Sequence, residues 1–212
     1  LASIKDIDEI PKFEKYDDFY FILIQSPHVI TEEEQEDSVS GDYSVAPLGI
    51  LYTDKYLITI SEGRNDVVNY LKLKLKNFNH NHIVSTENIP QFILKLLLFT
   101  SKIYLRYLKV INNKIRIAQS LLERSPQNDE IIHLMDLEKS LVFFSTSLRS
   151  NHIVIEKIAK RKFFLENEEN EELLDDIRDE NKQALETVSV YTRIIANISS
   201  TFSSVISNNL NQ

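Results

Sequence analysis

The amino-acid sequence predicts an α+β protein, in which a part with short strands is followed by long helices. Before residue 86 the apolar residues gather in short runs that are rich in β-branched and aromatic side chains. After it they recur at helical spacing almost to the end of the chain. We expect a sheet domain over residues 1–85, a pair of long helices packing on it over 86–165, and a single terminal helix over 170–212.

Three apolar runs predict the strands of the first part. Residues 19–25 form one continuous run, which indicates a buried strand. Residues 45–51 and 56–60 indicate two further strands, and the segment Thr53-Asp-Lys55 between them is typical of a hairpin turn. The stretch from Thr31 to Gly41 is acidic and has no period, so we expect a solvated loop there.

Two short helices are expected beside the strands. Residues 1–10 are compatible with a short helix, which Pro11 would end because proline cannot continue a helix. Residues 64–78 carry apolar residues at helical spacing, namely Val67, Val68, Leu71 and Leu75.

Three long helices are predicted in the second half. The segment from Ser85 to Pro90 offers polar capping residues and a proline for the first turn, so a helix begins there and runs to about Arg124. Ser125-Pro126 ends it. A second helix is expected from Asp129 to about Phe164, and a third from about Glu171 to the last residue.

The terminal helix carries a regular apolar seam. Its steps alternate between three and four residues, which is typical of a coiled coil or a helix bundle. At 1.5 Å per residue, a helix of about 40 residues is ~60 Å long, so the seam needs the two preceding helices, other copies of the chain, or both as its partners. The seam consists of Leu174, Ile177, Asn181, Ala184, Val188, Tyr191, Ile195, Ile198, Phe202 and Val205.

The composition excludes several classes of function. The absence of cysteine removes disulfide scaffolds, cysteine–zinc sites, iron–sulfur clusters and thiol nucleophiles, and the 3 glycines do not form a phosphate-binding loop. A formal net charge of -8 argues against a nucleic-acid partner, whereas acidic clusters attract cations. The densest apolar stretch, residues 92–99, is far shorter than the ~20 residues of a membrane-spanning helix.

The start of the terminal helix is the clearest candidate for cation binding. The stretch from Glu166 to Glu180 is dense in carboxylates, and Asp176 and Asp179 share one helix face at an i,i+3 spacing. Like charges this close are stabilised by a hard divalent cation such as Mg²⁺, which prefers oxygen ligands. The alternative is a solvated acidic helix start, which the helix dipole tolerates.

Other chemical motifs are weak. Glu130-Ile-Ile-His133 has the Glu-x-x-His spacing of two-metal helix bundles, but such sites need two copies and the sequence offers one. His80 and His82 could share a metal ion, although no third ligand is placed beside them. We therefore do not expect an enzyme.

An ordered set of segments is distinctive along the chain, although no single segment is. In their order these segments resemble the CorA family of magnesium channels and transporters, over essentially the whole sequence. The set is Pro11-Lys-Phe-Glu14, Tyr16-Asp-Asp-Phe-Tyr-Phe-Ile-Leu23, Tyr56-Leu-Ile-Thr-Ile60, Tyr104-Leu-Arg-Tyr-Leu108, Leu137-Glu-Lys-Ser-Leu-Val142 and Ser203-Ser-Val-Ile-Ser-Asn208-Asn-Leu-Asn211.

The resemblance implies a fold and a function. The family is homopentameric, and each protomer has an α/β/α sandwich domain with a mixed sheet, an outer helix pair and a stalk helix. Its transmembrane pair and Gly-Met-Asn signature would follow Gln212, so the chain is expected to be a cytoplasmic fragment from a cell-membrane protein, lacking also the N-terminal part of its sheet domain. Such a domain senses intracellular Mg²⁺ at the subunit interfaces and gates transport of the same ion, without catalysis.

The resemblance also implies site residues. Asp176 falls on the stalk-side metal aspartate of the family, and Asp179 lies one turn further on. The partner position in the sheet domain holds Ser3, which departs from the family, and Asp6, one turn later, is the candidate substitute. Asn211 falls near the cytoplasmic end of the pore.

Other functions stay open from the sequence. A transporter of zinc or another divalent cation from the same superfamily would share these features, because the residues that select the ion are not in the chain. A coiled-coil interaction protein that binds no metal would account for the seam alone.

Overall fold

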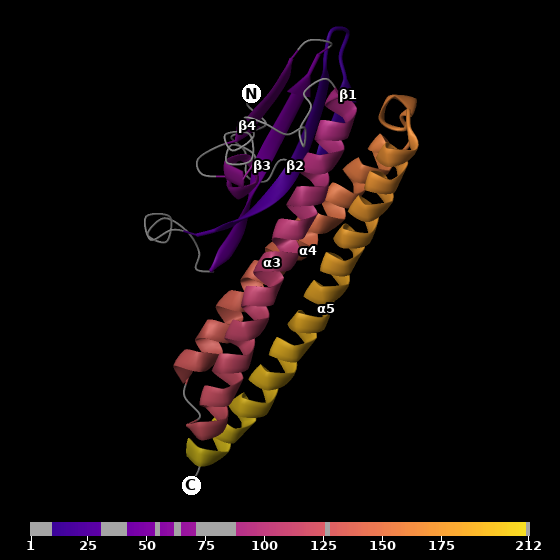
Figure 1. Ribbon diagram of the computed structural model, residues 1–212. Coiled ribbons are helices and arrows are strands. Elements are labelled where there is room, and N and C mark those ends of the chain that lie inside the picture. Colours follow the sequence, from indigo (N-terminus) through magenta and orange to yellow (C-terminus); the bar gives the residue numbers. More distant parts are fainter. Residues whose placement is uncertain are drawn as a thin grey trace.

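The computed structural model describes residues 10–30, 42–53, 56–61, 65–70, 88–125 and 128–210. A small sheet lies beside one end of a bundle of three long helices, and the bundle continues well beyond the sheet at its other end (Figure 1). The predicted α+β class, with long helices after the sheet, is confirmed.

The described strands form one antiparallel sheet. Their spatial order follows the sequence, and no parallel pairing of the kind found in a mixed sheet occurs among them. The last three confirm the strands predicted from the apolar runs. The strands are β1 (Lys12–Lys15), β2 (Tyr20–Val29), β3 (Tyr43–Tyr52) and β4 (Leu57–Ser61).

The predicted hairpin between β3 and β4 is also confirmed. Tyr52 pairs with Leu57 across the turn, and the amide of Thr53 donates a hydrogen bond to the carbonyl of Tyr56 at 2.8 Å. Strand β1 was not predicted from the sequence. It has only four residues and one buried side chain, Phe13, so it carries no alternating apolar pattern.

Both faces of β2 are covered. Six consecutive residues from Ile22 to Pro27 are buried, and successive side chains of a strand point to opposite faces. A helical turn over residues 66–70 is tied to this strand by Asn65, whose Nδ2 donates to the hydroxyl of Ser26 at 2.8 Å. The Oδ1 of the same asparagine accepts from the amide of Val67 at 3.1 Å and so caps the turn.

The first long helix, α3 (Ile89–Arg124), matches its predicted bounds closely. Asn88 caps it, because its Oδ1 accepts a hydrogen bond from the amide of Gln91 at 3.0 Å. The other long helices are α4 (Asn128–Ile158) and α5 (Glu168–Leu210).

Helix α4 ends earlier than the sequence predicts. The chain leaves it after Ile158 and forms a short 3₁₀ turn, η2 (Lys162–Phe164), before α5 begins. Phe164 packs edge-on against Phe13 and Tyr52 of the sheet, with ring centroids 6.2 Å apart in both pairs. Packing on the sheet therefore takes precedence over the helical pattern that continues through these residues.

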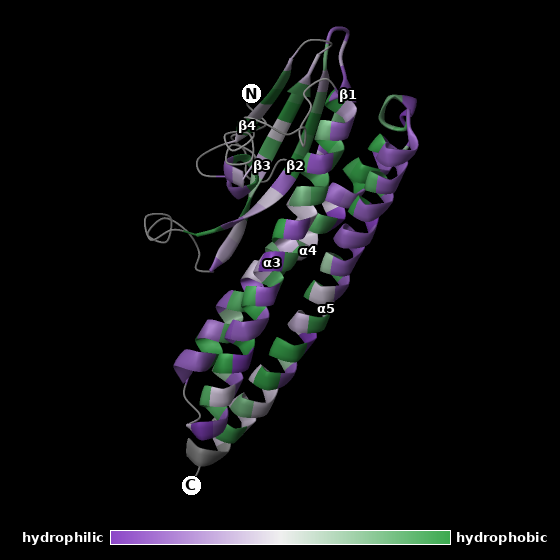
Figure 2. Ribbon diagram, viewed as in Figure 1, coloured by the Kyte–Doolittle hydropathy of each residue, from purple (hydrophilic) through white to green (hydrophobic). Residues whose placement is uncertain are grey.

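The seam of α5 is buried within the chain along most of its length. Its members from Leu174 to Ile198 lie against α3 and α4, so the two preceding helices are partners of the seam (Figure 2). Val205, near the end of α5, is 38% exposed, and α3 ends and α4 begins at this end of the bundle (Figure 1). No described helix has a stretch that is both long and apolar enough to cross a membrane.

The described core consists of two apolar clusters with buried polar residues at their junction. One cluster joins the sheet to the first half of α3, the end of α4, η2 and the start of α5, and the other joins the remaining parts of the three long helices to the start of β3. We call the polar residues at the junction the polar layer: Ser101 of α3, Ser147 and Asn151 of α4, and Asn181 of α5. Asn181 donates from Nδ2 to the carbonyl of Leu148 at 3.3 Å.

Candidate metal site on the terminal helix

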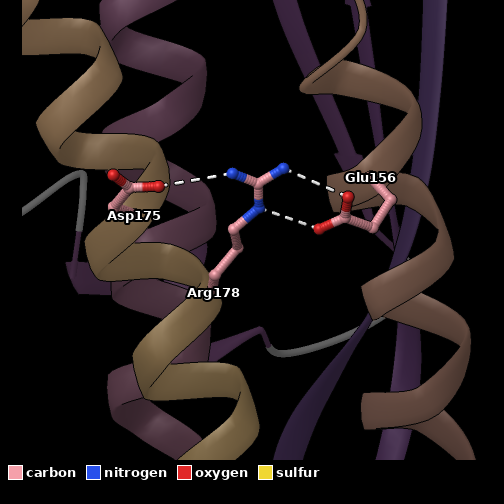
Figure 3. Close-up of polar contacts among 3 residues, drawn as sticks. All are labelled: Glu156, Asp175 and Arg178. Atoms are coloured by element: carbon pink, nitrogen blue, oxygen red, sulfur yellow. Dashed lines mark hydrogen bonds and ion pairs between the residues drawn. The ribbon is translucent and has the colours of Figure 1, made fainter.

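An arginine organises the acidic start of α5. Arg178 reaches across to α4, where its Nε and Nη2 donate to the two carboxylate oxygens of Glu156 at 2.8 and 3.1 Å (Figure 3). Its Nη1 donates to Asp175, one turn back on α5, at 3.3 Å (Figure 3). A planar guanidinium that binds a carboxylate through two parallel hydrogen bonds fixes the rotation of α5 against α4.

The same contact shifts two pKa values. The hydrogen bond from Arg178 lowers the pKa of Glu156 below its usual value, and the carboxylate in turn raises the pKa of Arg178. A lowered carboxyl pKa means that the folded state favours the ionised form, so the pair stabilises the fold above the usual glutamate value of 4.5. The stabilisation by the Glu156–Arg178 pair is lost as the pH falls through the lowered pKa of Glu156, where this carboxylate becomes protonated.

Replacing Glu156 by glutamine is expected to destabilise the protein by up to about 1 kcal/mol at neutral pH, since both side chains are more than a third exposed to solvent. The deficit relative to wild type should shrink as the pH falls from 7 towards 3, which thermal unfolding at a series of pH values would measure. In an Arg178→Met background the same substitution should have a much smaller pH-dependent effect, because only the weaker attraction of His152 and Lys160 then lowers the pKa of Glu156. A deficit of constant size across the series would contradict the assignment.

Two lysines of α3 neutralise other carboxylates of this region. Lys95 lies 3.8 Å from Glu169, and Lys102 lies 3.9 Å from Glu180. These ion pairs hold the start of α5 on α3, as Arg178 holds it on α4. The sequence analysis did not single out any of these three cations, although the i,i+3 spacing of Asp175 and Arg178 was readable from the sequence.

Asp176 and Asp179 lie between the neutralised carboxylates. Both are exposed on the outer face of α5, one turn apart. Within the described parts of the chain, neither is hydrogen-bonded or ion-paired to a basic side chain. Two carboxylates on one face, free of internal counter-ions, supply oxygen ligands of the kind that Mg²⁺ binds together with several waters.

The other sequence candidates are not brought to this face. Asp6, Ser3 and Asn211 lie outside the described residues, as do His80 and His82.

Glu130 and His133 are half-buried on α4, near the opposite end of the bundle. Among residues 10–30, 42–53, 56–61, 65–70, 88–125 and 128–210, no group of three or more histidine, aspartate or glutamate side chains is placed to hold a metal ion. Any ion at Asp176 and Asp179 must therefore draw further ligands from water, from another copy, or from residues outside these ranges.

The described structure is an antiparallel sheet packed on a three-helix bundle with an acidic outer face on the terminal helix, and this is the fold of the CorA soluble-domain structures. The family model described as CorA-like Mg²⁺ transporter protein matches residues 1–212. The chain belongs to this family, whose description names the transport of an ion and no chemical reaction.

Known proteins agree with this assignment. The chain is 23% identical, over 193 residues and 91% of its length, to the Cobalt/magnesium transport protein CorA of Methanocaldococcus jannaschii. It superposes on the complete structure of that species' CorA magnesium transporter with a TM-score of 0.84 and 21% identity over 99% of the chain. It spans 57% of the length of the curated relative and 63% of that solved chain.

The same fold occurs in a protein with a different name. The cytoplasmic domain of ZntB from Vibrio parahaemolyticus superposes with a TM-score of 0.73 and 11% identity, covering 97% of this chain and 77% of that domain. The fold is therefore shared among proteins with different names.

Proposed function

We propose that the chain is a cytoplasmic regulatory domain of a CorA-like Mg²⁺ channel or transporter, which binds intracellular divalent cations where subunits meet. The observation that carries the proposal is the pair Asp176 and Asp179, exposed on α5 without internal counter-ions while Asp175 and Glu180 beside them are neutralised. Carboxylates left available on a surface can bridge, through an ion, to a second subunit.

In this proposal α5 is the stalk helix of a homopentamer and leads towards a membrane-spanning region. The acidic outer face of one stalk meets the sheet domain of the next subunit, where Asp6 completes the site, and Asn211 approaches the pore. Bound ions favour the state of the assembly that brings these carboxylates together, and loss of the ions shifts the equilibrium away from that state. This coupling between ion binding and the state of the assembly requires no chemical reaction.

Replacing Asp176 by alanine tests the proposal. The wild-type chain should gain thermal stability and resistance to proteolysis in Mg²⁺, by about 2.7 kcal/mol when the ion is at 100 times its dissociation constant. The variant should lose most of this gain, because one of the two carboxylates that hold the ion is missing.

Two controls separate binding from charge screening. The Glu186→Ala variant removes another exposed carboxylate of α5 and should respond to Mg²⁺ as the wild type does. Sodium chloride at matched ionic strength should reproduce none of the gain. Identical responses of wild type and Asp176→Ala to millimolar Mg²⁺ would refute the proposed site. A response to Zn²⁺ and not to Mg²⁺ would keep the site and assign the domain to a zinc transporter.

A further inference from the structure

A pocket of about 710 Å³ opens where the end of the sheet meets the helices. It lies beside the start of β2, the end of β3 and the first turn of α3, away from the C-terminal end of α5 (Figure 1). Its volume falls within the range of about 300–1,000 Å³ that is usual for small-molecule sites. We call it the end pocket. The residues on which the argument rests are Lys15, Asp18, Tyr20, Tyr52, Phe163 and Glu166.

Three aromatic rings of the end pocket lie parallel. The rings of Tyr20, Tyr52 and Phe163 are within 5° of parallel in every pair, and their centroids are 4.8 to 6.3 Å apart. Such rings present flat apolar surface to a planar group, and the face of an aromatic ring attracts a cation. The ammonium of Lys15 already lies 5.5 Å from the centroid of the Tyr20 ring. The rings therefore suit a ligand that is both flat and positively charged.

The rim of the end pocket is acidic. Asp17, Asp18 and Glu166 are exposed there, and Lys15 is the basic residue beside them in the described part of the chain. Within that part, none of the three carboxylates is ion-paired or hydrogen-bonded to a basic side chain. Arg161 lies instead over the ring of Phe13, at 5.5 Å from its centroid. The excess of carboxylates favours a cation in the pocket.

The arrangement of the carboxylates distinguishes between kinds of cation. In the described ranges, no three acidic or histidine side chains converge as the ligands of a metal ion. A metal such as Mg²⁺ or Ca²⁺ needs its oxygen ligands at about 2.0–2.6 Å. Carboxylates that are spread around a rim suit a larger cation, which carries hydrogen-bond donors along its edge.

The hydroxyl of Tyr52 is a second and independent indication of a ligand. Tyr52 is 2% exposed, and its hydroxyl has no hydrogen-bond partner among the described residues. Buried polar groups in folded proteins are nearly always hydrogen-bonded, because a missing partner costs free energy. Burial raises the pKa of this hydroxyl above its usual value of 10.0, so it is neutral at neutral pH and its oxygen can accept a hydrogen bond. Because Tyr52 lines the end pocket, a bound N–H group would supply the missing partner.

From these observations we propose that the end pocket binds a planar organic cation of the guanidinium type. A guanidinium is flat, remains charged at any physiological pH and carries N–H donors around its edge. In the pocket it stacks on the ring of Phe163, donates to Asp18 and Glu166 at the rim, and donates to the hydroxyl of Tyr52. The inference goes beyond the proposed function and does not involve Asp176 or Asp179, so each can fail without the other.

Calorimetric titration of the full 212-residue chain with agmatine in EDTA tests the proposal. Agmatine is a small amine that ends in a guanidinium, and it should bind with a Kd of about 1 mM or tighter. Two matched compounds separate the properties of this group. N-carbamoylputrescine has a neutral planar urea in its place, and putrescine has an ammonium, which is charged but not planar. Each should bind at least about tenfold more weakly.

Variants of the pocket residues locate the binding. Tyr52→Phe should weaken agmatine binding about tenfold and leave thermal stability equal to or above that of the wild type, because the hydroxyl it removes lacks a described partner. Asp18→Asn and Glu166→Gln should each weaken binding up to about fivefold, as expected for exposed ion pairs. Glu186→Gln removes an exposed carboxylate of α5 that does not line the pocket and should leave binding unaltered.

A further titration identifies the source of the guanidinium. N-acetyl-arginine methylamide carries the same group on a peptide unit. If it binds as tightly as agmatine, the pocket takes an arginine side chain of a peptide. If it binds about tenfold more weakly, the pocket takes a free guanidinium compound. Both results support the proposed chemistry.

Four results would overturn the inference. The first is an absence of agmatine binding up to about 10 mM. The second is binding of N-carbamoylputrescine or putrescine as tight as that of agmatine. The third is a Tyr52→Phe variant that binds agmatine as the wild type does. The fourth is a Tyr52→Phe variant of lowered thermal stability, since the hydroxyl would then have a partner in the free protein.

Discussion

Replacing Phe164 by alanine is expected to lower the free energy of unfolding by about 3–5 kcal/mol, the usual cost of emptying a fully buried aromatic site. Phe164 is 0% exposed and lies edge-on to the rings of Phe13 and Tyr52. Few groups are placed to refill the cavity, because η2 is a short turn that packs against α3 and the sheet. Chemical denaturation followed by circular dichroism would measure the loss.

The neighbouring residue provides a matched control. Phe163 has the same side chain on the same turn but is 38% exposed, and its ring stacks on Tyr52 at a centroid distance of 5.7 Å. Its replacement by alanine should cost about 1–1.5 kcal/mol, in the range of an exposed aromatic pair. Equal losses for the two variants would show that Phe164 does not anchor the connection between α4 and α5.

Replacing Asn151 by alanine should have the next largest effect, a loss of about 2–3 kcal/mol. The carboxamide of Asn151 binds both backbone groups of Gln25 in β2, accepting from its amide at 2.8 Å and donating to its carbonyl at 2.7 Å. On the other side Gln25 pairs with Pro47, which has no N–H to donate. Alanine would remove the acceptor that Asn151 Oδ1 offers to the buried amide of Gln25, and the loss of a partner by a buried polar group costs about 1–3 kcal/mol.

A second variant distinguishes the lost hydrogen bond from a general loss of packing. The hydroxyl of Tyr104 also donates to the carbonyl of Gln25, at 3.1 Å. The combined Asn151→Ala/Tyr104→Phe variant should lose more than the sum of the single losses, because only then does that carbonyl lack both donors. Ser150→Ala, at an exposed hydroxyl on the same helix, should cost less than about 0.5 kcal/mol. Asn151→Ala costing no more than Ser150→Ala would contradict this account.

The sequence predicted the elements whose pattern is local. The run over residues 19–25 and the seam of α5 both depend on the spacing of apolar residues within one segment, and both were located correctly. Strand β1 and the early end of α4 depend on distant partners. Phe13 and Phe164 are buried by each other and by Tyr52, and no periodicity in either segment records that contact.

The candidate site was predictable in part for the same reason. The density of carboxylates at the start of α5 is visible in the sequence, and so is the shared face of Asp176 and Asp179. Which carboxylates are neutralised is not visible, because the cations come from other positions: Lys102 from α3, and Arg178 through its bond to Glu156 of α4. Only the packed bundle distinguishes the available carboxylates from those already paired.

The buried amide of Asn181 limits how the terminal helix can move. Its bond to the carbonyl of Leu148 exists at one axial position, and a shift by a heptad in either direction would press the carboxamide into an aliphatic layer such as that of Leu174 or Val188. An axial shift of α5 against α4 would therefore break the hydrogen bond of Asn181, whereas a tilt of the three helices as one unit would leave it intact. The position of Asn181 along α5 thus sets the axial register of the terminal helix against α4.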